Sequence, residues 1–242
     1  MKLPALGLLS SVFLFAACAA GQFDETVPGE TRPEGLPPQT VVVLGSSTAA
    51  GTGASAPDSS WVGRFRENFL ALRPGSRVVN LARGGYTTYH LLRAGDTAGA
   101  PAGIRPDTAR NVAAAAVLRP DVVIVNLPSN DAAAGIPADV ELRNLRRIDS
   151  AARATGAEVY VATTQPRNFE EAERRGRQAT TRDSVLAYYG DRALDFWTDV
   201  ATEDDRIGPR LDSGDGIHLN DRGHRLLYRR VWAAVVEARR AP

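Results

Sequence analysis

The sequence predicts an α/β domain in which a parallel sheet is covered by helices on both sides. Three observations lead to this prediction. Short apolar runs alternate with longer helical segments, which is the pattern of βαβ units. The run 121–127 is apolar at consecutive positions, as expected of a strand with both faces covered. No internal repeat and no second linker interrupts the chain, whose 242 residues suit one domain of ordinary size.

The strands are expected where apolar and β-branched residues cluster between turn signals. Residues 40–44 form a β-branched run, and 121–127 is the strongest strand of the chain. The full set of expected strands is 40–44, 77–81, 121–127, 158–163 and 193–196. Consecutive parallel strands end at the same edge of a sheet, and function gathers at that edge in such folds.

The helices are expected from helical spacing and from breakers. Residues 60–72 place Trp61, Phe65 and Phe69 on one face before a Pro-Gly stop, 106–118 is alanine-rich, and 140–154 is amphipathic. A polar segment rich in arginine and glutamate follows, and we interpret its charges as a solvated face. The full set of expected helices is 60–72, 106–118, 140–154, 169–189 and 220–239.

The N-terminal segment has the composition of a targeting sequence. Lys2 precedes an apolar stretch too short to span a membrane comfortably, and small residues then lead to Cys18, the only cysteine. We expect a lipoprotein signal peptide over 1–17, lipidation of Cys18 and a flexible tether over 18–39. The folded domain is then 40–242. An ordinary signal peptide with an incidental cysteine is the alternative.

The composition excludes several classes of function. The net charge of +1 gives no basic field for nucleic acid. Lys2 is the only lysine, which excludes a Schiff base, a pyridoxal-phosphate anchor and a P-loop in the domain. No two histidines share a metal-ligand spacing, and the glycines after the first strand do not match the dinucleotide fingerprint. We therefore expect neither a metal nor another cofactor.

Candidate site residues follow three of the predicted strands. Ser47 comes after the first strand, Gly85 after the second and Asn130 after the third. Much later in the chain, Asp215 precedes His218 by three residues, and a glycine between them permits a tight turn. Such a turn brings the carboxylate to one ring nitrogen and leaves the other free to take a proton from a serine. The alternative is a surface turn that caps the last helix, although Asn220 can cap that helix alone.

Four segments resemble the sequence blocks of the SGNH hydrolases, the GDSL-type esterase and lipase superfamily. They are 44–53, 80–88, 125–131 and 215–224. The resemblance implies a flavodoxin-like three-layer α/β/α sandwich and ester hydrolysis through an acyl-enzyme. By the same resemblance Ser47 is the nucleophile and His218 and Asp215 are the base and the acid. The oxyanion donors are then the N–H groups of Ser47 and Gly85 and the amide of Asn130.

The chain departs from the family pattern at two positions. Ser46 stands where the Gly-Asp-Ser motif has aspartate, and Pro128 stands where the third block has glycine. That aspartate carries no proton in the usual mechanism, so we expect its loss to affect the loop more than the chemistry. Proline fixes φ and donates no hydrogen bond, so the loop before Asn130 is expected to differ in shape.

The resulting hypothesis is a lipid-anchored serine esterase of the bacterial cell envelope, in the periplasm or at the outer membrane. Its expected substrate is a short acyl ester, foremost acetyl on carbohydrate or cell-wall glycan. A lysophospholipase or thioesterase, an acyltransferase and a non-catalytic glycan-binding module are the alternatives.

Further residues are expected around this site. Asp131, Gln165 and Arg167 are possible substrate contacts, although Asp131 more simply holds its loop and Arg167 equally suits a solvated loop. His224 is expected to be structural, and His90 to be exposed on a helix. The sequence indicates no oligomeric state.

Overall fold

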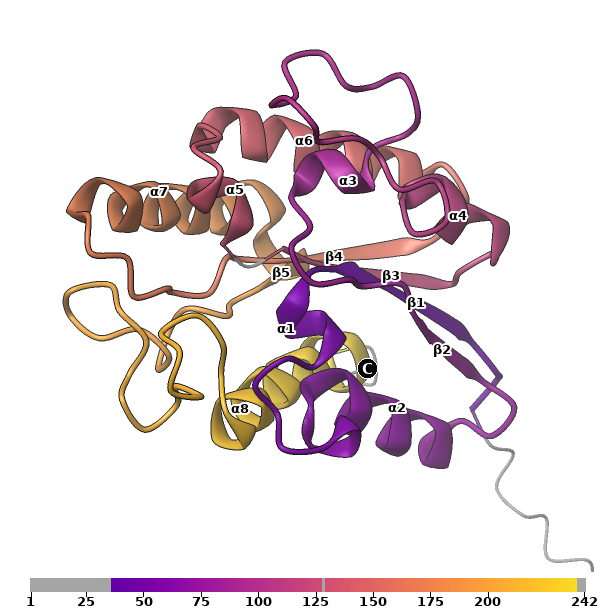
Figure 1. Cartoon of the computed structure of the whole chain (residues 1–242). Helices are drawn as coiled ribbons and strands as arrows, with labels where there is room; N and C mark the ends of the chain where they lie inside the picture. The colour runs from indigo at the N-terminus through magenta and orange to yellow at the C-terminus, as the bar shows by residue number, and fades with distance from the viewer. Residues whose placement is uncertain (1–35, 128, 239–242) are drawn as a thin grey trace, which may run out of the picture. The chain divides into compact units, whose positions relative to one another are not determined.

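The computed structural model describes residues 36–127 and 129–238, and the five strands in this part of the chain form one sheet (Figure 1). They are β1 (Thr40–Gly45), β2 (Arg77–Asn80), β3 (Val122–Asn126), β4 (Glu158–Ala162) and β5 (Ala193–Leu194). All neighbours are parallel, in the order β2-β1-β3-β4-β5. This is the flavodoxin-like order of doubly wound sheets, so the predicted fold class is confirmed. The predicted signal peptide, Cys18, most of the tether and Pro128 lie outside the described residues.

The helices cover both faces of the sheet. They are α1 (Ser47–Ala50), α2 (Trp61–Leu72), α3 (Thr88–Leu91), α4 (Val112–Val117), α5 (Asn130–Ala133), α6 (Ala138–Arg153), α7 (Ala172–Tyr189) and α8 (Asp221–Trp232). Figure 1 shows α3, α4, α6 and α7 on one side of the sheet and α2 and α8 on the other. The three layers of an α/β/α sandwich result.

The strands alternate their side chains between two buried cores. Val41 and Val43 of β1 pack into the core beneath α2 and α8, whereas Val42 and Leu44 pack into the core beneath α4 and α6. Because successive residues of a strand point to opposite faces, a strand buried on both sides must be apolar at every position. Burial of one such side chain contributes about 1.5–3 kcal/mol.

Three predicted helices have different ends in the structure. The helix expected over 106–118 begins only at Val112, because Asn111 caps it and accepts the N–H groups of Ala113 and Ala114. The segment expected from residue 169 becomes helical at Ala172. The last helix changes to a π-helix, Ala233–Glu237, before residue 239.

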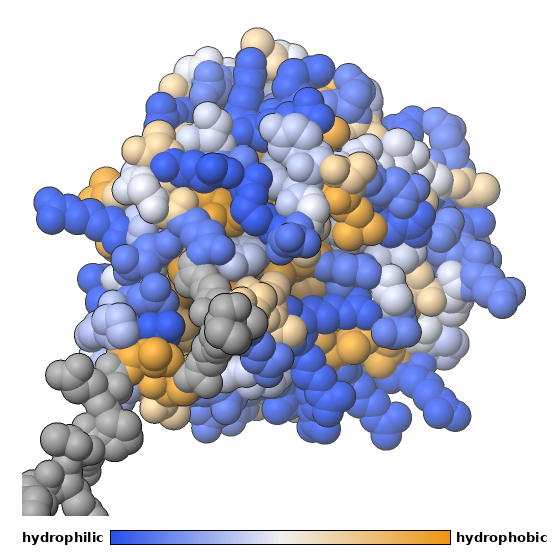
Figure 2. Space-filling model, turned by 180° about the vertical axis from the view of Figure 1, so that it is seen from behind, coloured by the Kyte–Doolittle hydropathy of each residue, from blue (hydrophilic) through white to orange (hydrophobic). Residues whose placement is uncertain are grey.

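One face of the molecule is mainly hydrophilic (Figure 2). Figure 2 shows the face turned away from the viewer of Figure 1, with apolar side chains in scattered groups among polar ones. None of the described helices is both long and apolar enough to cross a bilayer.

Candidate active site

Ser47 lies at the carboxyl end of β1, as the first residue of α1. The turn into the helix needs a glycine. A Cβ on Gly45 would lie 2.5 Å from the Asn126 carbonyl oxygen and 2.8 Å from the Ala49 Cβ. The Ser47 residue is 8% exposed, and its N–H has no partner within α1 because it is the first helical residue. The fold thus holds a serine at the sheet edge with its backbone N–H available.

The loop after β2 lies directly beside Ser47. A Cβ on Gly84 would be 3.8 Å from the Ser47 Cβ, and Arg83 N–H donates to the Gly45 carbonyl at 3.2 Å. Gly85 has a φ of +84°, in the left-handed region that favours glycine. Its N–H donates to no acceptor among the described residues. A second free backbone donor therefore lies next to the serine.

Asn130 begins α5, just after β3. Its Nδ2 lies 2.7 Å from Ser46 Oγ and 2.9 Å from the carbonyl oxygen of Tyr86. These contacts tie the loop after β3 to the loops after β1 and β2. The three predicted oxyanion donors therefore belong to loops that meet at one edge of the sheet, where β1 and β3 lead to opposite faces, the usual place of a ligand crevice in this fold.

Asp215 and His218 are joined in one tight turn. His218 Nδ1 lies 2.6 Å from Asp215 Oδ2, and Asp215 Oδ1 accepts the N–H groups of Ile217 and His218 at 2.9 and 2.8 Å. Gly216 has a φ of +67°, so the glycine expected to permit this turn does so. The predicted contact of the carboxylate with one ring nitrogen is present.

The charge of Asp215 fixes the state of the histidine ring. Partial burial alone raises the pKa of Asp215, but hydrogen bonds from the ring and backbone of His218 and from Ile217 N–H outweigh it and hold the pKa well below its usual value. An ionised carboxylate at Nδ1 keeps a proton on that nitrogen. The Nε2 of a neutral His218 is then a free acceptor.

Gly53 brings the serine and histidine segments together. The N–H of Thr52 donates to the Ser47 carbonyl at 2.9 Å, and the next residue packs against the histidine turn. A Cβ on Gly53 would lie 2.9 Å from the His218 Cβ and 2.3 Å from the Leu219 carbonyl oxygen. No hydrogen bond links Ser47 Oγ to the His218 ring among the described residues. Such bonds often tighten only when substrate binds.

The family of the chain follows from its sequence as a whole. A model of the GDSL-like lipase/acylhydrolase family matches residues 43–226. The chain belongs to this family. It is an ester hydrolase. The matched range contains Ser47, Gly85, Asn130, Asp215 and His218. No curated protein sequence matches the chain.

Solved structures share the fold of this GDSL hydrolase. TesA has a TM-score of 0.62 at 23% identity, with 82% of this chain and 99% of TesA covered. The psychrotrophic esterase EstA from Pseudoalteromonas sp. has a TM-score of 0.59 at 18% identity, covering 84% and 100%. A carbohydrate acetylesterase family member from Sinorhizobium meliloti has a TM-score of 0.57 at 17% identity, covering 81% and 97%.

Asp131, one of the possible substrate contacts, points into the interior of the GDSL hydrolase. It is 1% exposed and accepts both the N–H of Thr88, at 3.0 Å, and its hydroxyl, at 2.6 Å. Burial raises its pKa to about 6. Glu141 of α6 is also buried. Its pKa is raised well above the usual value, mainly by burial and in addition by the charge of Asp131. Sequence analysis missed Glu141, because its position on an amphipathic helix gave no sign of burial.

Gln165 and Arg167 follow β4, and Gln165 supports the histidine turn. Gln165 is fully buried, and its Nε2 donates to the Ile217 carbonyl at 2.9 Å. Arg167 stacks on Phe169, with 4.7 Å between its Cζ and the ring centroid. Burial lowers the pKa of Arg167, and nearby Arg174 lowers it further. The charge of Asp215 acts in the opposite direction.

The other histidines lie in different surroundings. His224 is fully buried, with Nδ1 3.3 Å from Trp61 N and Nε2 3.1 Å from the Thr52 carbonyl oxygen, so it is structural as predicted. The expectation of an exposed His90 was wrong. It is half-buried because its ring stacks on Tyr86, with centroids 4.6 Å apart.

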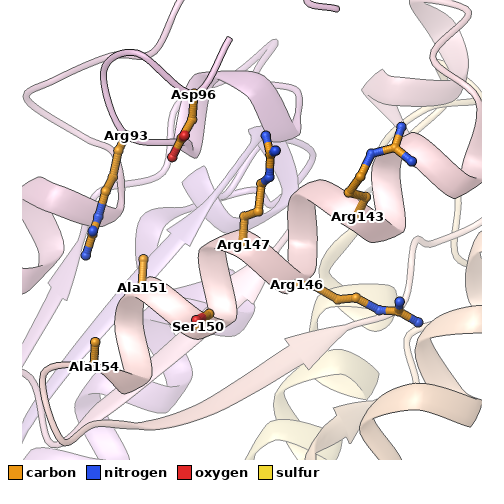
Figure 3. Close-up of a pocket in the computed structure, with 8 residues that line it drawn as sticks. All are labelled: Arg93, Asp96, Arg143, Arg146, Arg147, Ser150, Ala151 and Ala154. Carbon is orange, nitrogen blue, oxygen red and sulfur yellow. The ribbon is translucent and has the colours of Figure 1, made fainter. Parts of the chain in front are cut away.

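Arginines line a separate hollow of about 460 Å³ on the outer side of α6. Figure 3 shows Arg143, Arg146 and Arg147 standing on the helix, with Arg93 and Asp96 across from them. The guanidinium groups point in different directions. Arg143 pairs with Asp139, and Arg146 stacks on Tyr188. The hollow is lined by no histidine and by none of the predicted site residues. Across the described residues, no three His, Cys, Asp or Glu side chains group as metal ligands.

Proposed function

We propose that the chain cleaves short acyl esters, foremost acetyl esters of carbohydrate or cell-wall glycan, with Ser47 as nucleophile. The observation that carries this proposal is the 2.6 Å contact between His218 and Asp215, in a turn packed on the glycine loop that follows the serine. The contact supplies an oriented base, which a serine hydroxyl requires in order to attack.

The first half-reaction acylates the enzyme. Ser47 Oγ forms a bond to the ester carbonyl carbon while its proton passes to Nε2 of His218. The carbonyl electron pair moves onto oxygen, and the N–H groups of Ser47 and Gly85 and the Asn130 amide bind the resulting oxyanion. The intermediate then collapses. The bond to the alcohol oxygen breaks, and the proton on His218 passes to the leaving alcohol.

The second half-reaction uses water in place of the serine. A water oxygen attacks the acyl carbon, and His218 takes one of its protons. Ser47 leaves with the proton returned by His218, and the carboxylic acid is released. Asp215 stays ionised throughout and stabilises the charged ring.

A polar hollow lies beside Gly53, and none of the proposed triad or oxyanion residues lines it. The hollow has a volume of about 350 Å³ and is lined by Ser55, Arg210, Asn220, Asp221 and Arg222. Hydroxyl, amide and charged groups of this kind match the hydrogen bonds of a sugar better than an alkyl chain. A carbohydrate acetylesterase family member from Sinorhizobium meliloti shares the fold, and acetyl esters of carbohydrate are therefore the first substrates to test.

A second candidate function is lysophospholipase or thioesterase activity. A neighbouring hollow of about 480 Å³ shares Arg210 with the first and is lined also by Asp199, Gly208, Pro209 and Leu211. Its apolar side chains, Pro209 and Leu211, suit an alkyl chain, and none of the proposed triad or oxyanion residues lines it. Rates on p-nitrophenyl esters of increasing chain length separate the two candidates: a maximum at acetate supports the first and a maximum at longer chains the second.

Labelling with a fluorophosphonate tests the nucleophile. We expect the wild type and a Ser184→Ala control to be labelled, and Ser47→Ala to remain unlabelled; the Ser184 hydroxyl lies on α7 and donates to the Thr180 carbonyl. Mass spectrometry should place the label on Ser47. A folded wild type that takes up no label supports the glycan-binding module instead. Acetylated xylan and peptidoglycan then test the substrate, and ester products formed with an added alcohol would indicate an acyltransferase.

We also propose that Cys18 carries a lipid that holds the enzyme in the cell envelope. The support is the sequence before Cys18 alone. The mature N-terminal peptide should begin with a lipidated cysteine in mass spectrometry, and Cys18→Ala should release the protein from the membrane fraction. An unmodified cysteine in membrane-bound protein would contradict the proposal.

A further inference from the structure

Ser46, the residue before the proposed nucleophile, has a hydroxyl that the helix does not use. The residue is the N-cap of α1, a position where serine usually accepts a backbone N–H of the first turn. Ser46 makes no such bond. Its side chain is fully buried, and its Oγ lies 2.7 Å from Nδ2 of Asn130. The hydroxyl is thus directed to the amide.

The Asn130 amide is held from two sides. Its Nδ2 also lies 2.9 Å from the carbonyl oxygen of Tyr86. Because a carbonyl oxygen only accepts hydrogen bonds, the nitrogen of the amide must face Tyr86. The same nitrogen gives its second hydrogen to Ser46 Oγ. Two acceptors on two different loops therefore set the plane and the direction of the amide.

The backbone of Ser46 has a separate structural role. Its N–H donates to the Asn126 carbonyl at 3.1 Å, and its carbonyl accepts the Ala50 N–H at 2.9 Å. These bonds join β1 to β3 and start α1, and they do not involve the side chain. A change of the Ser46 side chain therefore leaves the connection from strand to helix in place and acts on Asn130.

We propose that Ser46 is a positioning residue of the reaction, whose hydroxyl holds the Asn130 amide ready to donate to the oxyanion. The inference rests on the proposed function, which makes Asn130 one of the three donors. Donors stabilise a transition state most when they are oriented before the reaction. The hydroxyl is a neutral acceptor, whereas a charged acceptor forms a hydrogen bond roughly twice as strong. The hydrogen given to Ser46 Oγ is shared with the oxygen of the substrate in a three-centre bond, so Ser46 continues to orient the amide as negative charge develops there.

The test is a double-mutant cycle on p-nitrophenyl acetate. We expect Ser46→Ala to lower kcat about 3- to 10-fold, the value of one ordinary hydrogen bond, with KM and Tm close to the wild type. Ser46→Cys keeps the size of the side chain but offers only a weak acceptor, so its kcat should fall similarly. Asn130→Ala should lose about 10²–10³-fold in kcat. Ser46→Ala/Asn130→Ala should be no slower than Asn130→Ala, because Ser46 acts through the amide.

The outcomes separate this inference from the proposed function. A wild-type kcat in Ser46→Ala, or a loss confined to KM or Tm, overturns the role of Ser46. A double variant slower than Asn130→Ala by the full Ser46→Ala factor overturns it as well. If Asn130→Ala itself has the wild-type kcat, the proposed oxyanion role of Asn130 fails, and the role of Ser46 fails with it. A slow Asn130→Ala beside a normal Ser46→Ala removes only the role of Ser46.

Discussion

Asp215 holds both the ring and the backbone of His218: its Oδ2 lies 2.6 Å from Nδ1, and its Oδ1 accepts the N–H of the same residue at 2.8 Å. One carboxylate thus sets the position of the histidine and the direction of its ring. A substitution that removes the charge of Asp215 but keeps its shape therefore tests the effect of the charge on the reaction.

Asp215→Asn removes the charge and keeps an oxygen acceptor for the turn. We expect kcat on p-nitrophenyl acetate to fall about 10²–10⁴-fold, because the amide neither fixes the Nδ1 proton nor stabilises a charged ring. Asp183→Asn, on the exposed surface of α7, is the matched control and should keep the wild-type rate. A kcat within twofold of the wild type in Asp215→Asn would show that the orienting group lies elsewhere.

Gly53→Ala should damage the reaction as well as the fold. Gly53 and Gly103 both have left-handed φ values, +92° and +82°, and this conformation alone costs alanine about 1–2 kcal/mol of stability at either position. Only at Gly53 does the new Cβ meet the histidine turn. A Cβ on Gly103 meets nothing within 4 Å. A displaced His218 should lower kcat by about 10-fold or more.

Gly103→Ala serves as the control in the same kinetic and melting measurements. We expect it to keep its kcat while its Tm falls. Equal kcat values for the two glycine variants would mean that the Gly53 contact does not position the histidine.

Replacing His218 should lower turnover, whereas replacing His224 should lower the stability of the fold. His224→Ala leaves Trp61 N–H and the Thr52 carbonyl without their partner, so we expect a loss of about 2–3 kcal/mol in the free energy of unfolding. His218→Ala should keep the Tm and lose about 10³-fold or more in kcat. Urea unfolding and steady-state kinetics on both variants test the pair. A folded His218→Ala with normal turnover would remove it as the base.

Long patterns in the sequence predicted most of the fold. The strands β1, β3 and β4 and the helices α2 and α6 differ from expectation by at most two residues at either end, because long apolar runs and helical spacing carry a strong signal. The four-residue helices α1, α3 and α5 are too short to show periodicity. They are also the helices that follow the serine, glycine and asparagine loops, so the local shape of the site was the part least visible in the sequence.

The site itself was predictable in its residues and less so in its contacts. The places of Ser47, Gly85 and Asn130 follow from their positions after parallel strands, and the His218–Asp215 contact follows from three-residue spacing with a glycine. The pairing of Ser46 with Asn130 joins positions 84 residues apart. It depends on how closely two loops approach, and no local pattern encodes that distance.

Two buried carboxyl groups beside the Asn130 loop predict an unusual dependence of stability on pH. Asp131 and Glu141 are 1% and 4% exposed, and the hydrogen-bond donors to their side chains are neutral groups of Thr88 and Thr181. Burial raises the pKa of Asp131 to about 6 and raises that of Glu141 well above its usual value. Between about pH 4, near the pKa of an unfolded carboxyl, and pH 6, the folded state binds more protons than the unfolded state.

The contribution of Asp131 to stability is therefore complete below about pH 4 and is lost as the pH rises through about 6. Asp131→Asn cannot ionise and keeps an oxygen for Thr88. We expect the Tm of Asp131→Asn minus that of the wild type to increase by a few degrees as the pH rises from 4.5 to 7.5. Groups that do not interact with Asp131, among them His224, cancel in the difference, and the lower pKa of Glu141 without the charge of Asp131 adds to the gain. Asp139→Asn, at an exposed carboxyl on α6, should show no such gain. A constant Tm difference between wild type and Asp131→Asn across this range would mean that Asp131 is ionised in the folded protein throughout.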